Sequence, residues 1–134
     1  MSGVFADTFY FLALLNPRDE KHAAVRAWSR ESESEVVTTD YVLVEVADGM
    51  AHSRRRTQAA ELVESLRSMP GFRVIEADTA LLRRGLALYA DRPDKEWSLT
   101  DCISFVVMER EGLREALTGD RHFAQAGFVA LFAE

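Results

Sequence analysis

The sequence has 134 residues, of which 48% are hydrophobic and 28% are charged. This length and composition predict one globular domain over residues 1–134 and exclude a largely disordered chain. The 16 Lys and Arg residues against 22 Asp and Glu residues leave a net charge of -6, which argues against a protein that coats nucleic acid through overall positive charge.

Apolar runs and helical patterns alternate along the first half of the chain. We predict a strand over 4–6, a helix over 9–15, a helix within 19–32, a strand over 36–38 and a helix over 40–50. The apolar run over 41–47 fits a strand or a helix, and Asp40 as an N-cap favours the helix. The order of strand, helix and strand is typical of a βαβ unit.

The same alternation continues through the second half. We predict a helix over 54–69, a strand over 72–75, a helix over 78–89, a helix over 98–111, a strand over 116–118, a helical turn over 122–124 and a strand over 128–132. Gly112 is the expected stop of the helix that Ser98 opens. This order predicts an α/β fold with three layers (α/β/α) and a central parallel sheet of four to five strands.

The only cysteine, Cys102, has no partner for an internal disulfide, and its apolar surroundings suggest a packed, reduced thiol. No positively charged start precedes an apolar run of the kind that leads a chain to export. The longest apolar runs are far shorter than the roughly 20 residues of a membrane span. We therefore expect a cytoplasmic protein without membrane contact.

Four acidic residues are the candidate functional groups. Asp7 and Asp120 each follow a predicted strand, and Asp101 lies in the first turn of the helix that Ser98 opens. All three are therefore expected at the carboxyl edge of the sheet, where open α/β sheets bind ligands. Glu45 stands in an apolar run, where an ionised carboxylate needs a cation or hydrogen-bond donors.

Each acid also has a structural interpretation, which the residues alone leave open. Asp7 and Asp120 could cap a helix or a turn. The segment 98–101 fits the capping-box pattern S-x-x-[DE]. Glu45 could share a solvated stripe of its helix with Asp48. The flanking residues and the order of the acids therefore carry more weight than any one acid.

Four segments surround these acids: VFADT (4–8), VLVEV (42–46), WSLTDC (97–102) and LTGDRHF (117–123). In this order they resemble the PIN-domain ribonuclease family over nearly the whole chain. They are most similar to the VapC-type toxins of type II toxin–antitoxin systems. The patterns S-L-T-D and T-x-D-x-H-F are the most specific of the set.

The resemblance implies a PIN-like domain and a metal-dependent endoribonuclease. The family's acidic quartet, which binds metal and carries catalysis, maps onto Asp7, Glu45, Asp101 and Asp120. Thr118 matches a supporting hydroxyl position, where it would orient a water molecule or a neighbouring carboxylate. The resemblance also implies an RNA substrate, whose class it leaves open, and a cognate antitoxin protein that holds the toxin silent.

The chemistry of four grouped carboxylates favours hard cations. Like charges raise one another's pKa, and bound cations relieve that conflict. Because the expected donors are all oxygen atoms, Mg²⁺ or Mn²⁺ suits the site better than Zn²⁺, with either one or two ions bound. Hydrolysis by a water whose pKa is lowered there predicts products with a 5′-phosphate and a 3′-hydroxyl.

Other residues suggest weaker alternatives. Three histidines, His22, His52 and His122, could support a metal-free acid–base mechanism, but surface, capping or structural roles fit their surroundings better. The arginine cluster 54–56 could contact RNA phosphates, although a solvated helix start is the commoner role of such a cluster.

The aromatic residues Trp97 and Tyr10 could stack on unpaired bases, with core packing as the favoured interpretation. The early helices carry more apolar residues than one small core needs, which suggests a homodimer or an antitoxin groove. These residues include Phe9, Phe11, Leu12, Leu14 and Trp28.

Two other classes of function compete with a nuclease. One is a catalytically weak PIN-like module that acts through a protein partner, against which the complete set of acids argues. The other is a phosphoryl-accepting domain, which also places an aspartate after its first strand. That class usually carries a further acid nearby, whereas Asp7 is followed by Thr8 and two aromatic residues.

Overall fold

The computed structural model describes residues 3–134 and contains one sheet of five parallel strands. The strands are β1 (Gly3–Ala6), β2 (Glu35–Thr39), β3 (Phe72–Ile75), β4 (Glu115–Leu117) and β5 (Val129–Ala130). Their order across the sheet is β3-β2-β1-β4-β5, so β1 lies at the centre. The predicted parallel sheet is confirmed, at the upper end of the expected strand number.

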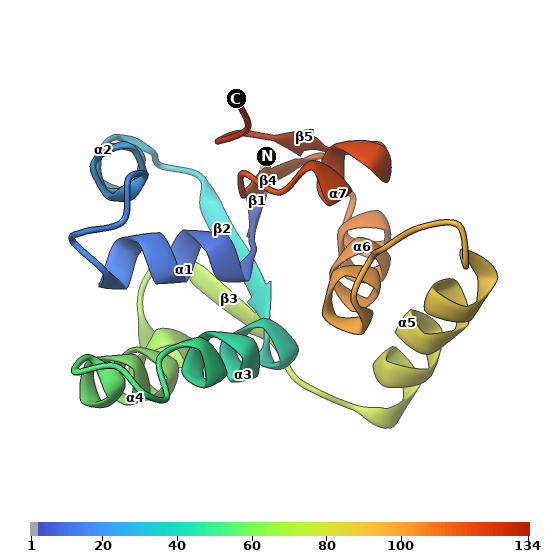
Figure 1. The fold of residues 1–134 in the computed structure, drawn as a ribbon, viewed down its shortest axis with the longest axis horizontal. Helices are drawn as coiled ribbons and strands as arrows, with labels where there is room; N and C mark the ends of the chain where they lie inside the picture. Colours follow the sequence, from blue (N-terminus) through green and yellow to red (C-terminus); the bar gives the residue numbers. More distant parts are fainter. Residues whose placement is uncertain (1–2) are drawn as a thin grey trace.

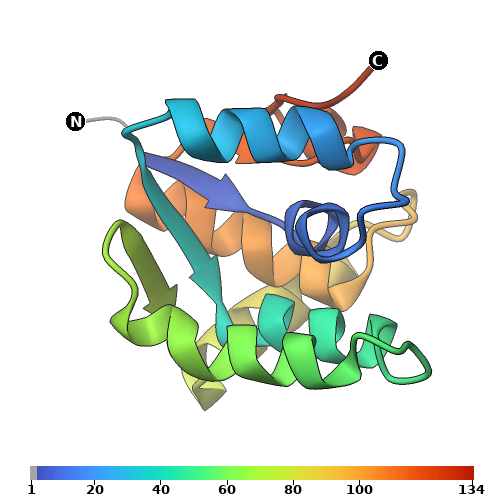
Figure 2. The same cartoon turned by 90° about the vertical axis from the view of Figure 1, so that its left-hand side faces the viewer.

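Helices cover both faces of this sheet, which confirms the predicted three layers. The helices are α1 (Thr8–Leu15), α2 (His22–Glu31), α3 (Asp40–Gly49), α4 (Arg56–Ser65), α5 (Thr79–Asp91), α6 (Leu99–Glu111) and α7 (Arg121–Gln125). In Figure 1, α1, α2 and α4 lie to the left of the strands, whereas α5 and α6 lie to the right. Figure 2, seen from the left, shows α6 behind the strands.

The strand order creates a topological switch point next to β1. The chain moves from β1 to β2 and β3 on one side, and then crosses back to β4 and β5 on the other. The register pairs Phe5 of β1 with Val37 of β2 and with Ala116 of β4. Because ligands in open α/β sheets bind beyond the carboxyl ends of strands at such a point, the loops after β1 and β4 frame the expected site.

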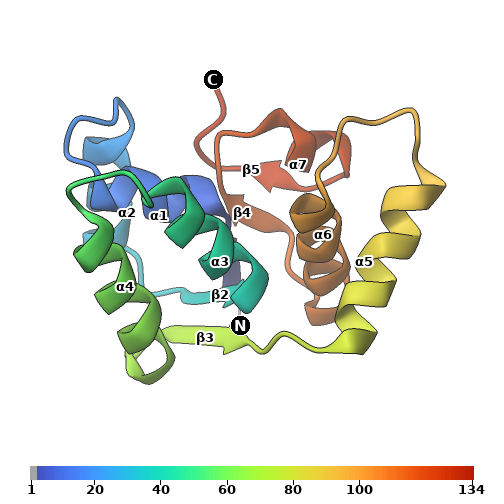
Figure 3. The ribbon, with the colours of Figure 1, turned by 60° about the horizontal axis from the view of Figure 1, so that its bottom comes forward.

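Helix α3 lies where the two helical layers meet. It contacts α1 and α4 on one side and α6 on the other, and Figure 3 shows α3 between α4 and α6. Any side chain that α3 directs toward the switch point can therefore reach groups from both layers.

The core is built around β1 and α6. In β1, Val4, Phe5 and Ala6 are buried, which is expected for a central strand with helices on both faces. Phe105 of α6 packs edge to face against Phe123 of α7, with 4.9 Å between the ring centroids. This contact joins the helical layer to the segment that follows β4.

Local signals explain where several helices begin and end. Ser98 and Asp101 form a complete capping box at the start of α6, and Gly112 ends that helix with φ of 69°. The prediction of Asp40 as N-cap of α3 is wrong. The Thr39 hydroxyl accepts the Val42 N–H instead, and Asp40 is the first helical residue.

Further boundaries differ from the prediction, and β4 covers Glu115–Leu117 rather than 116–118. The helix predicted over 54–69 divides into α4 and a 3₁₀ turn (Leu66–Ser68), because the chain tightens before Pro70 and the next strand. The last strand is limited to Val129–Ala130 within the predicted 128–132. Among residues 3–134, no helix combines the length and apolar character that a bilayer crossing needs.

The contact between α5 and α6 depends on a glycine. A Cβ at Gly85 would overlap Ile103 Cγ1 and lie 3.1 Å from Ile103 Cα. We expect Gly85→Ala to lower the free energy of unfolding by about 1–3 kcal/mol, because overpacking outweighs the gain in helix propensity. Urea denaturation measures this change.

The matched control is Gly49→Ala at the end of α3. There a Cβ meets only the flexible end of Leu12, with Cδ2 at 3.3 Å. We expect this variant to be as stable as the unmodified protein, or more so. Equal stability of both variants would mean that Gly85 does not set the helix spacing.

Candidate active site

The site begins with a hydrogen bond between two neighbouring strands. Asp7 follows β1 directly, and Thr118 follows β4 directly. The Thr118 hydroxyl donates to Asp7 Oδ2 at 2.9 Å and accepts the backbone N–H of Asp120 at 3.0 Å. One buried hydroxyl thus fixes two acids at the switch point, which is the carboxylate-orienting role that the sequence suggested for Thr118.

The other two predicted acids arrive from helices on opposite faces. Asp101 lies in the first turn of α6, where its Oδ2 accepts the Ser98 N–H at 3.1 Å. Glu45 projects from α3, and its Oε1 accepts a hydrogen bond from the hydroxyl of Thr8, the residue after Asp7. Glu45 therefore does have the hydrogen-bond partner that its apolar surroundings demanded, and this partner comes from the start of α1.

His122 is a further member of this cluster. Its Nδ1 lies 3.0 Å from Asp101 Oδ2 and 3.5 Å from Asp120 Oδ1. One donor atom from each of these three side chains lies within 4.8 Å of the others. The sequence placed His122 near Asp120 but favoured a structural role. Its position in D-x-H-F, in the first turn of α7, was the signal that it would face the acids.

All four predicted acids line one cavity of about 360 Å³. We call this cavity the acid pocket. Its other lining residues are Thr8, Phe9, Glu96, Ser98 and His122. Sequence reasoning did not single out Glu96, which precedes the Trp97–Ser98 pair and adds another negative charge at the rim. The structure thus brings together every predicted site residue, from four separate segments.

The structural interpretations of the acids have mixed outcomes. The Asp7 side chain makes no capping hydrogen bond, although it stands at the N-cap of α1. Asp101 and Asp120 do cap α6 and α7, and these contacts coexist with a position in the acid pocket. Glu45 is half-buried whereas Asp48 is exposed, so the two do not share one solvated stripe.

Three other residues that the sequence singled out, His22, Trp97 and Tyr10, do not line the acid pocket. His22 Nδ1 lies 2.7 Å from the carbonyl oxygen of Ala13, which is a structural contact. Trp97 is buried and its Nε1 donates to Gln125 Oε1 at 3.0 Å. Tyr10 is buried against the core. Core packing, rather than base stacking, therefore describes both aromatic residues.

Burial dominates the electrostatics of Asp7. Desolvation raises the pKa of its carboxyl group to about 7, and the charges of Asp101 and Glu45 push in the same direction. The hydrogen bonds from Thr118 and from the Thr8 backbone oppose that shift. An ionised Asp7 is consequently costly unless a cation lies close to it.

The donor set fits a divalent cation. Asp101, Asp120 and His122 offer two carboxylates and one imidazole at ligand spacing, and the buried Asp7 carboxyl lines the same cavity. Carboxylates suit Mg²⁺, Ca²⁺ and Mn²⁺, and imidazole suits transition metals. The imidazole of His122 thus adds a nitrogen atom beside the expected oxygen donors.

The fold and the acid pocket define a small three-layer α/β protein of the PIN class. The model of the PIN domain matches residues 4–129, and the chain belongs to this family. Within the family, the chain is 30% identical over 132 residues to the 23S rRNA-specific endonuclease VapC20 of Mycobacterium tuberculosis strain H37Rv, covering 98% of this chain and 99% of that protein.

Solved structures show the same relationship. The crystal structure of Mycobacterium tuberculosis VapC20, described as a sarcin-ricin loop cleaving toxin, matches with a TM-score of 0.87 and 26% identity over 96% of this chain and 98% of that one. A toxin–antitoxin complex from Klebsiella pneumoniae matches with a TM-score of 0.66 and 18% identity over 98% and 100% of the two chains. The second likeness concerns the fold alone.

The raised pKa of Asp7 predicts how stability depends on pH without metal. Between the unfolded pKa of 3.8 and the folded value of about 7, the folded state keeps a proton that the unfolded state loses. The contribution of Asp7 to the free energy of unfolding therefore falls as pH rises, by up to about 4 kcal/mol in total. Asp7→Asn has no such group to titrate.

Urea denaturation in EDTA, at about pH 4 and about pH 7, tests this linkage. We expect Asp7→Asn to gain stability relative to the unmodified protein as pH rises between these values. A stability difference that is independent of pH would show that Asp7 ionises normally in the folded protein.

Proposed function

We propose that this chain is a divalent-metal-dependent endoribonuclease and the toxin component of a toxin–antitoxin pair. One observation carries the proposal: four acids from separate segments line a single pocket at the switch point of the sheet. We assign Asp7, Glu45, Asp101 and Asp120 as the catalytic and metal-binding set, within one PIN-like domain over residues 1–134. The relationship to a toxin that cuts RNA supports this assignment.

The proposed metal is Mg²⁺ or Mn²⁺, held by the acidic set with His122 as a nitrogen donor. When bound, such an ion lowers the pKa of a water molecule and offsets negative charge on the phosphate. The role of the chain is to hold the donors in place. Thr118 positions Asp7 and Asp120, Thr8 positions Glu45, and the capping box positions Asp101.

The proposed substrate is RNA, with ribosomal RNA as the first class to examine. The relative that is 30% identical over nearly the whole of both chains is named for cutting 23S rRNA. The acids require no ribose 2′-hydroxyl as nucleophile, because the mechanism uses water. Products with a 5′-phosphate and a 3′-hydroxyl follow, and a 2′,3′-cyclic phosphate would contradict the mechanism.

The proposed partners are a cognate antitoxin and a second copy of the chain, in the cytoplasm. A structural neighbour that is a toxin–antitoxin complex supports the antitoxin. For the homodimer, the early helices offer no fully exposed large apolar side chain among the described residues. Phe11 is fully buried, and Phe9, Leu12, Leu14 and Trp28 pack against the core. The exposed apolar side chains instead include Leu82, Leu86 and Tyr89, on one face of α5.

Cleavage of a labelled ribosomal stem-loop RNA with Mg²⁺ or Mn²⁺ tests the proposed activity. We expect metal-dependent cutting that EDTA abolishes. Glu45→Gln should reduce it by at least about a hundredfold, because the substitution removes a charged ligand from the pocket. The matched control is Asp48→Asn, three residues further along α3 and exposed, which should retain full activity.

Two results would contradict this proposal. An equal loss of cleavage activity in Glu45→Gln and Asp48→Asn would show that the acid pocket does not carry out the reaction. If well-folded, partner-free protein cuts no ribosomal RNA segment, the result would favour the catalytically weak PIN-like module that acts through a protein partner.

Light scattering of the purified chain tests the homodimer. We expect a dimer at micromolar concentration, and Leu86→Glu should give a monomer because it places a charge in the apolar face of α5. Ala23→Glu, at an exposed position on α2, is the control and should leave the mass unchanged. A monomeric unmodified chain would rule out the dimer.

A further inference from the structure

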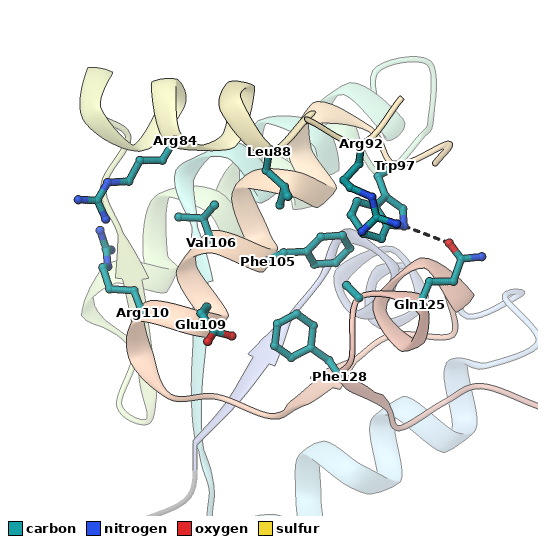
Figure 4. A pocket seen from close by; sticks show the side chains of 11 residues that line it. Arg84, Leu88, Arg92, Trp97, Phe105, Val106, Glu109, Arg110, Gln125 and Phe128 are labelled. Atoms are coloured by element: carbon teal, nitrogen blue, oxygen red, sulfur yellow. Dashed lines mark hydrogen bonds between the residues drawn. The ribbon is translucent and has the colours of Figure 1, made fainter. Parts of the chain in front are cut away.

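A second and larger cavity lies beside the acid pocket. It has a volume of about 570 Å³ and runs between α5 and α6 as far as the segment after α7 (Figure 4). We call it the α5–α6 groove. Its floor is apolar, from Leu88, Phe105, Val106, Ala126 and Phe128. Such a volume suits a group the size of a nucleotide or a drug-like ligand.

The groove and the acid pocket are lined by residues that are neighbours in the sequence. Trp97 and Gln125 line the groove at one end, joined by their hydrogen bond. The neighbours of Trp97 in the chain, Glu96 and Ser98, line the acid pocket. From there the groove follows α6 to Arg110, which is roughly 18 Å further along the helix axis at 1.5 Å per residue. A polymer cut in the acid pocket could therefore continue into the groove.

Guanidinium groups stand at both ends of the groove. At the near end, Arg92 lies over the Trp97 ring at 5.2 Å and is held by two hydrogen bonds to Asp94. At the far end, Arg84 from α5 and Arg110 from α6 point toward each other (Figure 4). The two cationic ends lie about 12 Å apart along α5, from the helical rise.

The far pair is only partly balanced by acids. Among residues 3–134, Arg84 forms no ion pair, and Arg110 Nε lies 3.4 Å from Glu111 Oε2, whose carboxylate is also held by Arg73. Glu109 lines the groove but pairs with neither arginine within that part of the chain. Two like charges that face each other are stabilised by an anion between them. Guanidinium groups match phosphate oxygens in geometry as well as in charge.

We propose that the α5–α6 groove binds a single-stranded part of the RNA substrate that flanks the cleaved phosphodiester. Arg84 and Arg110 contact a phosphate, and the apolar floor contacts a base. The proposal rests on the ribonuclease function proposed above.

RNA is favoured over an acidic protein segment because the residue at one end of the groove, Trp97, lies between two residues of the acid pocket, Glu96 and Ser98. An acidic pocket in a chain of net charge -6 repels a polyanion, so cationic groups beside it are needed to hold the RNA. Among the 16 Lys and Arg residues, only Lys21 and Lys95 are lysines. Most cationic groups of the chain are therefore guanidinium groups, which match phosphate in geometry.

The variant that tests the groove is Arg84→Gln with Arg110→Gln. Both residues are exposed and lie outside the acid pocket, so the fold and the chemical step should be unaffected. The matched control is Arg26→Gln with Arg30→Gln, two exposed arginines of α2. Thermal melting checks that both double variants are folded. A third variant, Arg84→Lys with Arg110→Lys, keeps the positive charge but removes the paired N–H donors of the guanidinium group.

Two measurements separate binding from cutting. Fluorescence anisotropy with a labelled ribosomal stem-loop RNA in EDTA reports binding without cleavage. We expect the groove variant to bind about tenfold more weakly, with a salt dependence shallower by about 0.7 to 1 in slope. In cleavage with metal, we expect KM to rise by a similar factor and kcat to be unchanged. The α2 control should match the unmodified protein in both.

The outcomes distinguish this inference from the proposed function. Cutting by the unmodified protein, with unchanged KD and KM in the groove variant, would overturn the groove and leave the nuclease intact. Groove-dependent RNA binding without any cutting would support the groove and count against the nuclease. Loss of antitoxin binding, with RNA binding retained, would identify a protein-docking surface and overturn the inference. Absence of RNA binding by the unmodified protein would also overturn it.

Discussion

The buried carboxyl group of Asp7 is the constraint on which the site depends. Asp7 ends the central strand, so both helical layers cover it and little water reaches it. Burial raises its pKa to about 7, and within residues 3–134 its side-chain donor is the Thr118 hydroxyl, which follows the neighbouring strand. The other acids add further negative charge around this buried carboxyl group, and among the described residues no positive charge balances it. The fold thereby creates a demand for a cation at the point where the strand order reverses.

Acidic and basic side chains gather in two different cavities of the molecule. The acid pocket gathers carboxylates with one imidazole, which suits a divalent ion. The α5–α6 groove next to it carries arginines above an apolar floor, which suits a phosphate and the flat face of a base. Trp97 and Gln125 line the groove, and the chain neighbours of Trp97 line the acid pocket. A chain with a net negative charge can therefore bind a polyanion, because local charge rather than total charge governs binding.

Much of the fold was predictable because its signals are local. The alternation of apolar runs and helical spacing predicted a parallel sheet between helices, and the capping box at Ser98 and Gly112 at the far end bounded α6 correctly. The errors also have local causes. Thr39 and Asp40 are both good N-cap residues, and only the path of the chain out of β2 selects the threonine. The division of the helix before Pro70 depends on where β3 must begin.

The sequence by itself determined the alternation of elements, the identity of the four acids and the family to which they point, because these depend on residue type and order. It also showed that Glu45 needs a partner, since its neighbours are apolar. Only the tertiary structure decided that the partner is Thr8, that His122 and Glu96 join the acids, and that arginines from α5 and α6 face each other. Those contacts join segments far apart in the chain, and their geometry follows from strand order and helix packing, which no local pattern encodes.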